Sequence, residues 1–347
     1  MVSLCNWRIM KIVCDDKIPF LRGVFEPCAE VVYLPGAAIT AADVRDADAL
    51  VVRTRTRCDA SLLEGSSVRV IASATIGYDH IDTAYCEAHG IAWANAPGCN
   101  SGSVAQYVGS ALAALSERFG LNLSAMTLGI VGVGHVGTKV ARVAQALGMR
   151  VLLNDPPRAA DEGPDGFFTL DEIIAGSDII TLHVPLTSET HHLFDASRIA
   201  SLRPDQILIN TSRGEVVDGD ALKRALRAAR LKAAVLDVWE HEPDIDPELA
   251  SLVEIATPHI AGYSLDGKAA GTTAAVRVVA HALGISELIN FSIKLDPVSP
   301  DSAEYDVTRD SDTLKSTLSK PDPAARASAF ERLRSEYPIR RELIPKD

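Results

Sequence analysis

Short apolar runs recur along the first 260 residues, each ending in polar, Gly or Pro residues and followed by enough chain for a helix. Runs that are apolar throughout, rather than alternating, are typical of parallel strands buried on both faces. The pattern therefore predicts two α/β domains, each built on a doubly wound parallel sheet. The expected strands are 10–14, 30–33, 49–52, 69–72 and 91–94 in the first domain, and 128–131, 150–153, 179–182, 207–210, 233–236 and 254–256 in the second.

Two longer stretches with helical spacing mark where the chain passes between these domains. Residues 101–115 are predicted to form a helix that leaves the first domain, and the stretch from Gly262 to Leu283 a helix that returns to it. We therefore predict a discontinuous domain of residues 1–102 and 262–289, an inserted domain of residues 103–261, and a short C-terminal segment of residues 290–347.

The C-terminal segment differs in composition, being richer in Asp, Ser, Pro and Arg. One amphipathic helix is expected there, with Phe330, Leu333 and Tyr337 on one face. Residues 318–329 are expected to form a loop.

Composition and charge narrow the function. The 347 residues include 34 Lys and Arg against 46 Asp and Glu, a formal net charge of −12, which is the wrong sign for a protein that neutralises phosphates of nucleic acid. The chain has neither an apolar run of about 18 to 20 residues nor a leader pattern, and strand-like periodicity starts at Met10, a candidate start residue. We expect a cytoplasmic protein without a membrane span. The six cysteines show neither CxxC spacing nor a zinc pattern, so no metal site is predicted.

The sequence GVGHVG at 132–137 fits the dinucleotide-binding pattern G-x-G-x-x-G, with an apolar strand before it and helical spacing after it. Gly132 would permit the tight turn, Gly134 the approach of a pyrophosphate, and Gly137 the close packing of helix and strand. His135 and Val136 complete the loop. The alternative is a glycine turn that binds nothing.

The next predicted strand ends at Asp155, where a carboxylate can accept hydrogen bonds from a ribose and would repel a 2′-phosphate. The sequence thus favours NAD over NADP as cofactor. Arg158 is the one feature that weakens this preference.

Ligands of open parallel sheets bind beyond the carboxyl ends of the strands, so the residues that follow each strand predict the site. Three of them combine a permanent cation, a carboxylate and an imidazole, namely Arg213, Glu242 and His259. Singly, each has an ordinary explanation, as a solvated arginine, a turn residue or one histidine among nine. Together, at strand ends of one nucleotide-binding domain, they indicate a catalytic site.

Three segments, INTSRGEVVD (209–218), LDVWEHEP (236–243) and TPHIAGYSLDGKAAGT (257–272), together with the glycine loop, resemble the D-isomer-specific 2-hydroxyacid dehydrogenase family over roughly residues 10–285. The resemblance implies a Rossmann-type NAD domain inserted in a flavodoxin-like substrate domain. Residues 74–82, 95–108 and 154–158 are most similar to a subfamily of pyridoxal 5′-phosphate biosynthesis.

The resemblance also implies a role for each residue of the site. Arg213 would hold the substrate carboxylate, His259 would take the hydroxyl proton, and Glu242 would orient His259 and favour its protonated form. Asp237 would face the nicotinamide carboxamide, although capping a loop is the alternative for it. Other residues implied to line the cofactor are Val184, Thr211, Ser212 and Gly262, and those implied to bind substrate are Thr54, Thr75 and Tyr263.

The resulting prediction is NAD-dependent oxidation of a small phosphorylated 2-hydroxy acid to its 2-oxo acid. Arg55 and Arg57 would meet the substrate phosphate or lie at a solvated edge. Residues 305–315 and 330–343 resemble fragments of a dimerisation domain, which implies a homodimer. Two alternatives stay open: another dehydrogenase of the family, such as a phosphoglycerate dehydrogenase or a hydroxypyruvate or glyoxylate reductase, and a non-enzymatic protein that senses NAD.

Overall fold

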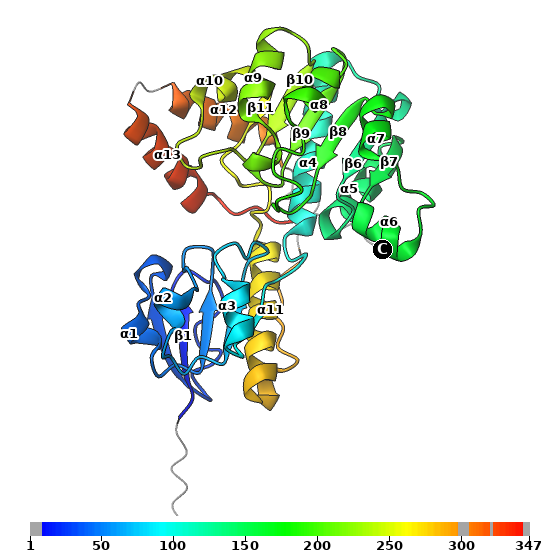
Figure 1. Ribbon diagram of the computed structural model, residues 1–347. Helices are drawn as coiled ribbons and strands as arrows, with labels where there is room; N and C mark the ends of the chain where they lie inside the picture. The colour runs from blue at the N-terminus through cyan, green and yellow to red at the C-terminus, as the bar shows by residue number, and fades with distance from the viewer. Residues whose placement is uncertain (1–8, 298–304, 320–321, 343–347) are drawn as a thin grey trace, which may run out of the picture. The chain divides into compact units, whose positions relative to one another are not determined.

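A computed structural model describes residues 9–297, 305–319 and 322–342 (Figure 1). The chain divides into two compact units, one of residues 1–100 and 264–297 and the other of residues 101–263 and 298–347. The first unit is therefore discontinuous in sequence. The described C-terminal residues group with the second unit, and a separate dimerisation segment there stays a prediction.

The first unit is built on a five-stranded parallel sheet in the order β2-β1-β3-β4-β5. Its central strands are buried along their whole length, as fully apolar runs require. The sheet has the flavodoxin-like order, which confirms the predicted fold class for this unit. The strands are β1 (Lys11–Asp15), β2 (Glu30–Leu34), β3 (Ala49–Val52), β4 (Val70–Ser73) and β5 (Ala92–Ala94).

Helices cover both faces of this sheet and complete two apolar cores. One core includes Val276 and Val279 of the returning helix, and the other includes Leu62, Leu63 and Cys86. The helices are α1 (Ala41–Val44), α2 (Ala60–Leu63), α3 (Thr83–Ala88) and α11 (Leu265–Leu283).

The second unit is built on a six-stranded parallel sheet in the order β11-β10-β9-β8-β6-β7. All six strands lie where the apolar runs predict them. They are β6 (Thr127–Val131), β7 (Arg150–Asn154), β8 (Ile179–Leu182), β9 (Ile207–Asn210), β10 (Ala233–Leu236) and β11 (Ile255–Ala256).

The strand order of the second unit has a switch point at β6. The chain runs from β6 to β7 on one side and then crosses to β8 on the other side of β6. Loops after β6 and β8 therefore diverge at the carboxyl edge and leave room for a ligand. The helices around this sheet are α4 (Ser101–Phe119), α5 (His135–Ala146), α6 (Pro156–Glu162), α7 (Leu170–Gly176), α8 (Ala196–Ser201), α9 (Gly219–Arg227), α10 (Pro247–Leu252), α12 (Val307–Leu318) and α13 (Pro323–Ser335).

The C-terminal residues are more helical than the sequence suggested. Residues 323–329, expected to be a loop, form the first half of α13, because Asp322 caps the helix and Pro323 occupies its first position, where a missing N–H costs nothing. Tyr337, expected on the helix, lies beyond its end at Ser335, because the following residue, Pro338, disfavours a helical conformation before it.

Within the described ranges, no helix combines the length and apolar character that crossing a membrane requires.

Candidate active site

The glycine loop forms a close turn between β6 and α5. Gly132 has φ +88°, and a β-carbon on it would lie 2.6 Å from the carbonyl oxygen of His183. A β-carbon on Gly137 would overlap the carbonyl oxygen of Gly132, whereas one on Gly134 would meet no atom within 4 Å. No side chain caps the N-terminus of α5 at Gly134. The loop thus leaves open space at an uncapped helix N-terminus, which fits the pyrophosphate of a dinucleotide.

Asp155 lies beside this loop, at the end of β7. Its Oδ2 accepts a hydrogen bond from the Val133 N–H at 2.7 Å, and its Oδ1 caps α6 through the Arg158 N–H at 3.1 Å. The Arg158 guanidinium donates two bonds to Glu162, both 2.7 Å, and one to the Val133 carbonyl. Because Glu162 already pairs with it, Arg158 is poorly placed to attract a 2′-phosphate, which agrees with NAD as the cofactor.

His183 follows β8 and faces the same edge. Thr181 Oγ1 lies 3.0 Å from its Nε2 and Thr211 Oγ1 lies 3.2 Å from its Nδ1. Burial lowers the pKa of His183 to about 3, so the ring is neutral near pH 7. Val184, the next residue, packs against Gly132, since its Cγ1 lies 3.0 Å from the added β-carbon there.

This neutral histidine makes stability depend on pH. In the unfolded chain His183 binds a proton below about pH 6.5, whereas the folded protein does not until about pH 3, so stability falls as the pH drops between these values. The contribution is at most about 1.4 kcal/mol per pH unit. We expect His183→Gln to flatten the decline in the free energy of unfolding between pH 7 and pH 5, measured by chemical denaturation. The exposed His191→Gln serves as control; equal slopes for wild type and His183→Gln would contradict the assignment.

The loop after β9 carries Thr211, Ser212 and Arg213, and Asn210 shapes it. Asn210 Oδ1 accepts hydrogen bonds from the N–H and the hydroxyl of Ser212, and its Nδ2 donates to the Arg213 carbonyl at 2.8 Å. A β-carbon on Gly214 would overlap the backbone of Trp239. This loop therefore packs directly against the one that carries Glu242, a contact that needs glycine.

Arg213, Glu242 and His259 line one cavity of about 220 Å³, with Gly214, Glu215, Trp239 and His241. His259 Nδ1 lies 2.7 Å from Glu242 Oε2, and Glu242 Oε1 accepts a hydrogen bond from the Trp239 N–H at 3.0 Å. Burial alone would raise the pKa of Glu242, but His259, Arg334 and the Trp239 N–H hold it below its usual value. The structure thus brings the cation, the carboxylate and the imidazole together.

Asp237 holds the loop on which His259 lies. Its buried carboxylate accepts hydrogen bonds from Thr257 Oγ1 at 2.6 Å and from the N–H groups of Ile260 and Ala261 at 2.8 and 2.9 Å. These bonds stabilise His259 in a left-handed conformation, φ +57°. The contacts match the loop-capping alternative for Asp237; a contact with the nicotinamide stays a prediction.

Three further residues that contact the loops of Glu242 and His259 were not predicted from the sequence. The Trp239 indole donates to the Thr257 carbonyl at 2.9 Å, and the Tyr107 hydroxyl lies 2.7 Å from Thr257 Oγ1. Tyr107 lies on α4, whose spacing marks it as a core residue. Arg334 on α13 lies beside Glu242. No local pattern identifies contacts between such distant segments.

The predicted substrate residues lie in different units. Thr54 and Thr75 belong to the first unit and Tyr263 to the second. Thr54 is exposed, and Thr75 Oγ1 lies 2.8 Å from Ser73 Oγ. Arg57 pairs with Asp59 at 2.6 Å. Roles in substrate binding stay predictions for all of these residues.

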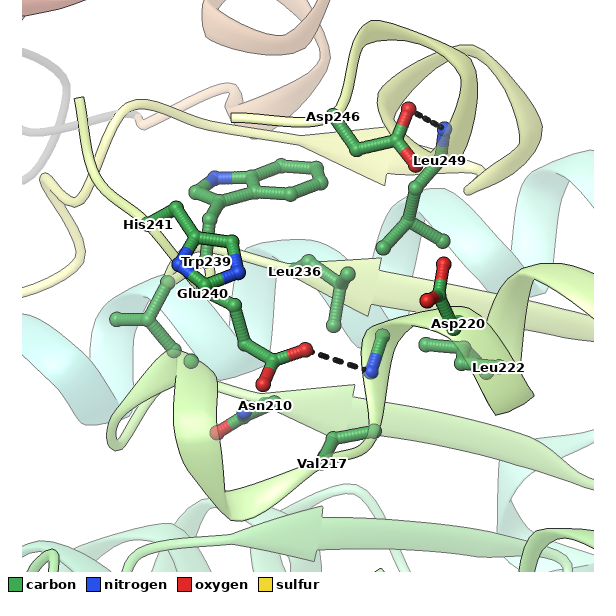
Figure 2. A pocket seen from close by; sticks show the side chains of 13 residues that line it. Asn210, Val217, Asp220, Leu222, Leu236, Trp239, Glu240, His241, Asp246 and Leu249 are labelled. Carbon is green, nitrogen blue, oxygen red and sulfur yellow. Dashed lines mark hydrogen bonds between the residues drawn. The ribbon is translucent and has the colours of Figure 1, made fainter. Parts of the chain in front are cut away.

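A second cavity, of about 210 Å³, shares Gly214, Trp239 and His241 with the first (Figure 2). Glu240 spans it, accepting from the Gly219 N–H at 2.9 Å and contacting His192 Nε2 at 2.8 Å. Arg213, Glu242 and His259 do not line it. The first cavity is therefore the candidate active site. The described ranges contain no cluster of three His, Cys, Asp or Glu side chains suited to a metal ion.

A dinucleotide loop and an acid–base pair beside an arginine, at one sheet edge, define a dehydrogenase of hydroxy acids. The chain belongs to the D-isomer specific 2-hydroxyacid dehydrogenase family, and residues 104–261 match its NAD binding domain. It is 50% identical over 351 aligned residues to the erythronate-4-phosphate dehydrogenase of Bacteroides fragilis, covering 96% of this chain and 97% of that relative.

Two solved structures share the fold. The D-lactate dehydrogenase of Aquifex aeolicus, complexed with NAD and lactic acid, superposes with a TM-score of 0.67 at 27% identity, covering 83% of this chain and 100% of that one. The NAD⁺-bound 3-phosphoglycerate dehydrogenase of Entamoeba histolytica gives a TM-score of 0.68 at 27% identity, covering 84% and 100%. The protein is an NAD-dependent oxidoreductase.

Proposed function

We propose that this protein oxidises 4-phospho-D-erythronate to (R)-3-hydroxy-2-oxo-4-phosphooxybutanoate, a step of pyridoxal 5′-phosphate biosynthesis. The observation that carries the reaction class is the His259–Glu242 pair in one cavity with Arg213. The substrate follows from the near full-length similarity to an erythronate-4-phosphate dehydrogenase.

The contact between His259 and Glu242 supports Nε2 of His259 as the atom that takes the proton. Glu242 accepts from Nδ1–H of His259, which leaves Nε2 as the acceptor for the C2 hydroxyl proton. The Glu242 carboxylate then stabilises the imidazolium that forms. Arg213 binds the substrate carboxylate through its planar guanidinium and so fixes C2 beside His259. Bound NAD supplies the oxidising power by accepting the hydride that leaves C2.

The residues that would hold NAD surround the carboxyl edge of the six-stranded sheet. The open face at Gly134 and the uncapped N-terminus of α5 suit the pyrophosphate, and Asp155 suits the adenosine ribose. The full proposed set is Gly132, Gly134, His135, Val136, Gly137, Asp155, Val184, Thr211, Ser212, Asp237 and Gly262.

We also propose a cytoplasmic homodimer. The acidic composition supports a cytoplasmic metabolic enzyme, and the C-terminal segment resembles a dimerisation domain. Light scattering of the purified protein tests the dimer.

A substrate panel tests the proposed function. We expect 4-phospho-D-erythronate with NAD to give a kcat/KM at least roughly a hundredfold above D-3-phosphoglycerate, because a site that binds a substrate hydroxyl discriminates strongly against an analogue lacking it. NADP should support much slower turnover. A preference for D-3-phosphoglycerate or hydroxypyruvate would favour another dehydrogenase of the family. NAD binding without turnover of any acid would favour the sensing protein; loss of turnover in Arg213→Ala excludes a contaminating enzyme.

A further inference from the structure

The C-terminal helix α13 places a cation beside the acid–base pair. Arg334 Nη1 lies 3.9 Å from Glu242 Oε2, the same oxygen that contacts His259 Nδ1. Both side chains are largely buried, with 21% of Arg334 and 18% of Glu242 exposed. Water therefore screens this pair weakly, and the charge of Arg334 acts on Glu242 at close range.

Packing fixes the position of this arginine. Phe330, one turn before it on α13, is fully buried in the core of the second unit, and Leu333 packs against that core. Helix α12 anchors the segment further. The Ser311 hydroxyl accepts a hydrogen bond from the Ala256 N–H at 3.0 Å, and Lys315 donates to two carbonyls in the turn between α10 and β11. Arg334 is thus held by the fold rather than free at the surface.

A second arginine of the same segment fastens the loop that carries His259. Arg340 donates to the Ile260 carbonyl at 3.1 Å and to the Ala261 carbonyl at 2.5 Å. Its guanidinium lies 4.1 Å from the centre of the Tyr305 ring. The C-terminal segment therefore contacts both the Glu242 carboxylate and the backbone of the loop that carries His259.

We propose that Arg334 is a positioning residue of the reaction: it keeps Glu242 ionised and limits how strongly the pair holds a proton on His259. Without this cation, the carboxylate would attract the proton on His259 more strongly, and the neutral base needed for oxidation would form only at higher pH. The inference rests on the proposed function, because it assumes that His259 is the base.

Other charged and titratable groups lie around the same pair and also contribute to its electrostatic environment. Arg213, His241 and Glu215 line the cavity with Glu242, and Tyr263 and Glu331 lie beside Arg334. The 3.9 Å separation makes Arg334 an ion-pair partner of Glu242 rather than a hydrogen-bond donor to it. An electrostatic effect, not a steric one, is therefore the expected consequence of its removal.

The test compares Arg334→Gln, Arg334→Lys and the exposed Arg332→Gln of the same helix across pH 5.5 to 9.5. In Arg334→Gln we expect the midpoint of kcat/KM for oxidation to move up by about one pH unit. Activity would fall about tenfold below the midpoint and lie within about twofold of wild type at pH 9.5. Arg334→Lys should restore the wild-type midpoint, and Arg332→Gln should not change it. If Arg334→Gln fails to fold, Arg334→Met keeps the apolar stem and replaces it.

A titration of the His259 ring by NMR, without substrate, gives a readout independent of turnover. Its midpoint should move in the same direction in Arg334→Gln. Equal loss of activity at every pH, or unchanged midpoints in both measurements, would overturn the proposal. An inactive wild type would instead refute the proposed function, whatever the NMR titration shows for Arg334.

Discussion

Replacing His259 by alanine is expected to lower kcat for oxidation by roughly a hundredfold or more, the usual scale for a lost general base. Because Nδ1 of its ring contacts Glu242, Nε2 is the nitrogen of His259 that can act as the base in this cavity. Because the glycine loop joins β6 to α5 whereas His259 follows β11, the affinity for NAD should stay nearly unchanged. Steady-state kinetics and a fluorescence titration with NADH measure the two quantities.

Two further observations belong to this test. Added imidazole should restore part of the activity, because the cavity of about 220 Å³ admits a small base once the ring is removed. In wild type, oxidation should slow and reduction should quicken as the pH falls, since the reverse reaction needs the imidazolium. The pKa of Glu242 is held below its usual value of 4.5, so Glu242 stays ionised between pH 5.5 and pH 9.5. Near-normal turnover of His259→Ala would end the assignment.

The strands of both sheets could be predicted from the sequence because burial on both faces requires a run of apolar residues. Strands such as β3, β8 and β9 lie inside parallel sheets and are buried throughout. Apart from Thr181 and Asn210, all their residues are apolar, so the run itself indicates the strand. The glycine loop could also be predicted from the sequence, because the close approach of the backbone at Gly132 and Gly137 permits no side chain. In both cases the constraint acts on consecutive residues.

Contacts between distant segments left no such pattern. Glu242 and Arg334 meet only because α13 packs on the six-stranded unit, and a single arginine on a polar helix gives no sign of a buried partner. The sequence placed Asp237 at a strand end, but it did not indicate that the carboxylate would accept hydrogen bonds from the backbone of Ile260 and Ala261. Its place in the chain predicted the right edge of the sheet, and only the geometry showed that its carboxylate caps the loop. A contact between Asp237 and the cofactor stays a prediction.

The glycine loop allows a second large effect to be tested with a matched pair of variants. Gly137→Ala should lower the free energy of unfolding by about 3 kcal/mol or more, beyond the usual cost of an extra methyl group in a packed core. Its β-carbon would overlap the Gly132 carbonyl oxygen and lie 3.0 Å from the carbonyl carbon, and neither backbone can yield without separating α5 from β6. NAD binding should be lost as well, because the glycine turn and the N-terminus of α5 would no longer lie side by side to hold the pyrophosphate. Urea denaturation and a titration with NADH measure both.

Gly134→Ala adds the same methyl group three residues earlier, where it would meet no protein atom within 4 Å in the described part of the chain. The backbone there has φ −74° and ψ −151°, outside the left-handed region that only glycine favours, so stability should change by less than about 1 kcal/mol. NAD affinity should nevertheless fall at least tenfold, because the methyl would occupy the space that the pyrophosphate approaches. The pair thus separates packing from binding: position 137 affects both, and position 134 affects binding alone. Normal NAD affinity in Gly134→Ala would mean that the phosphates do not approach this face of the loop, and the cofactor would have to lie elsewhere along the sheet edge.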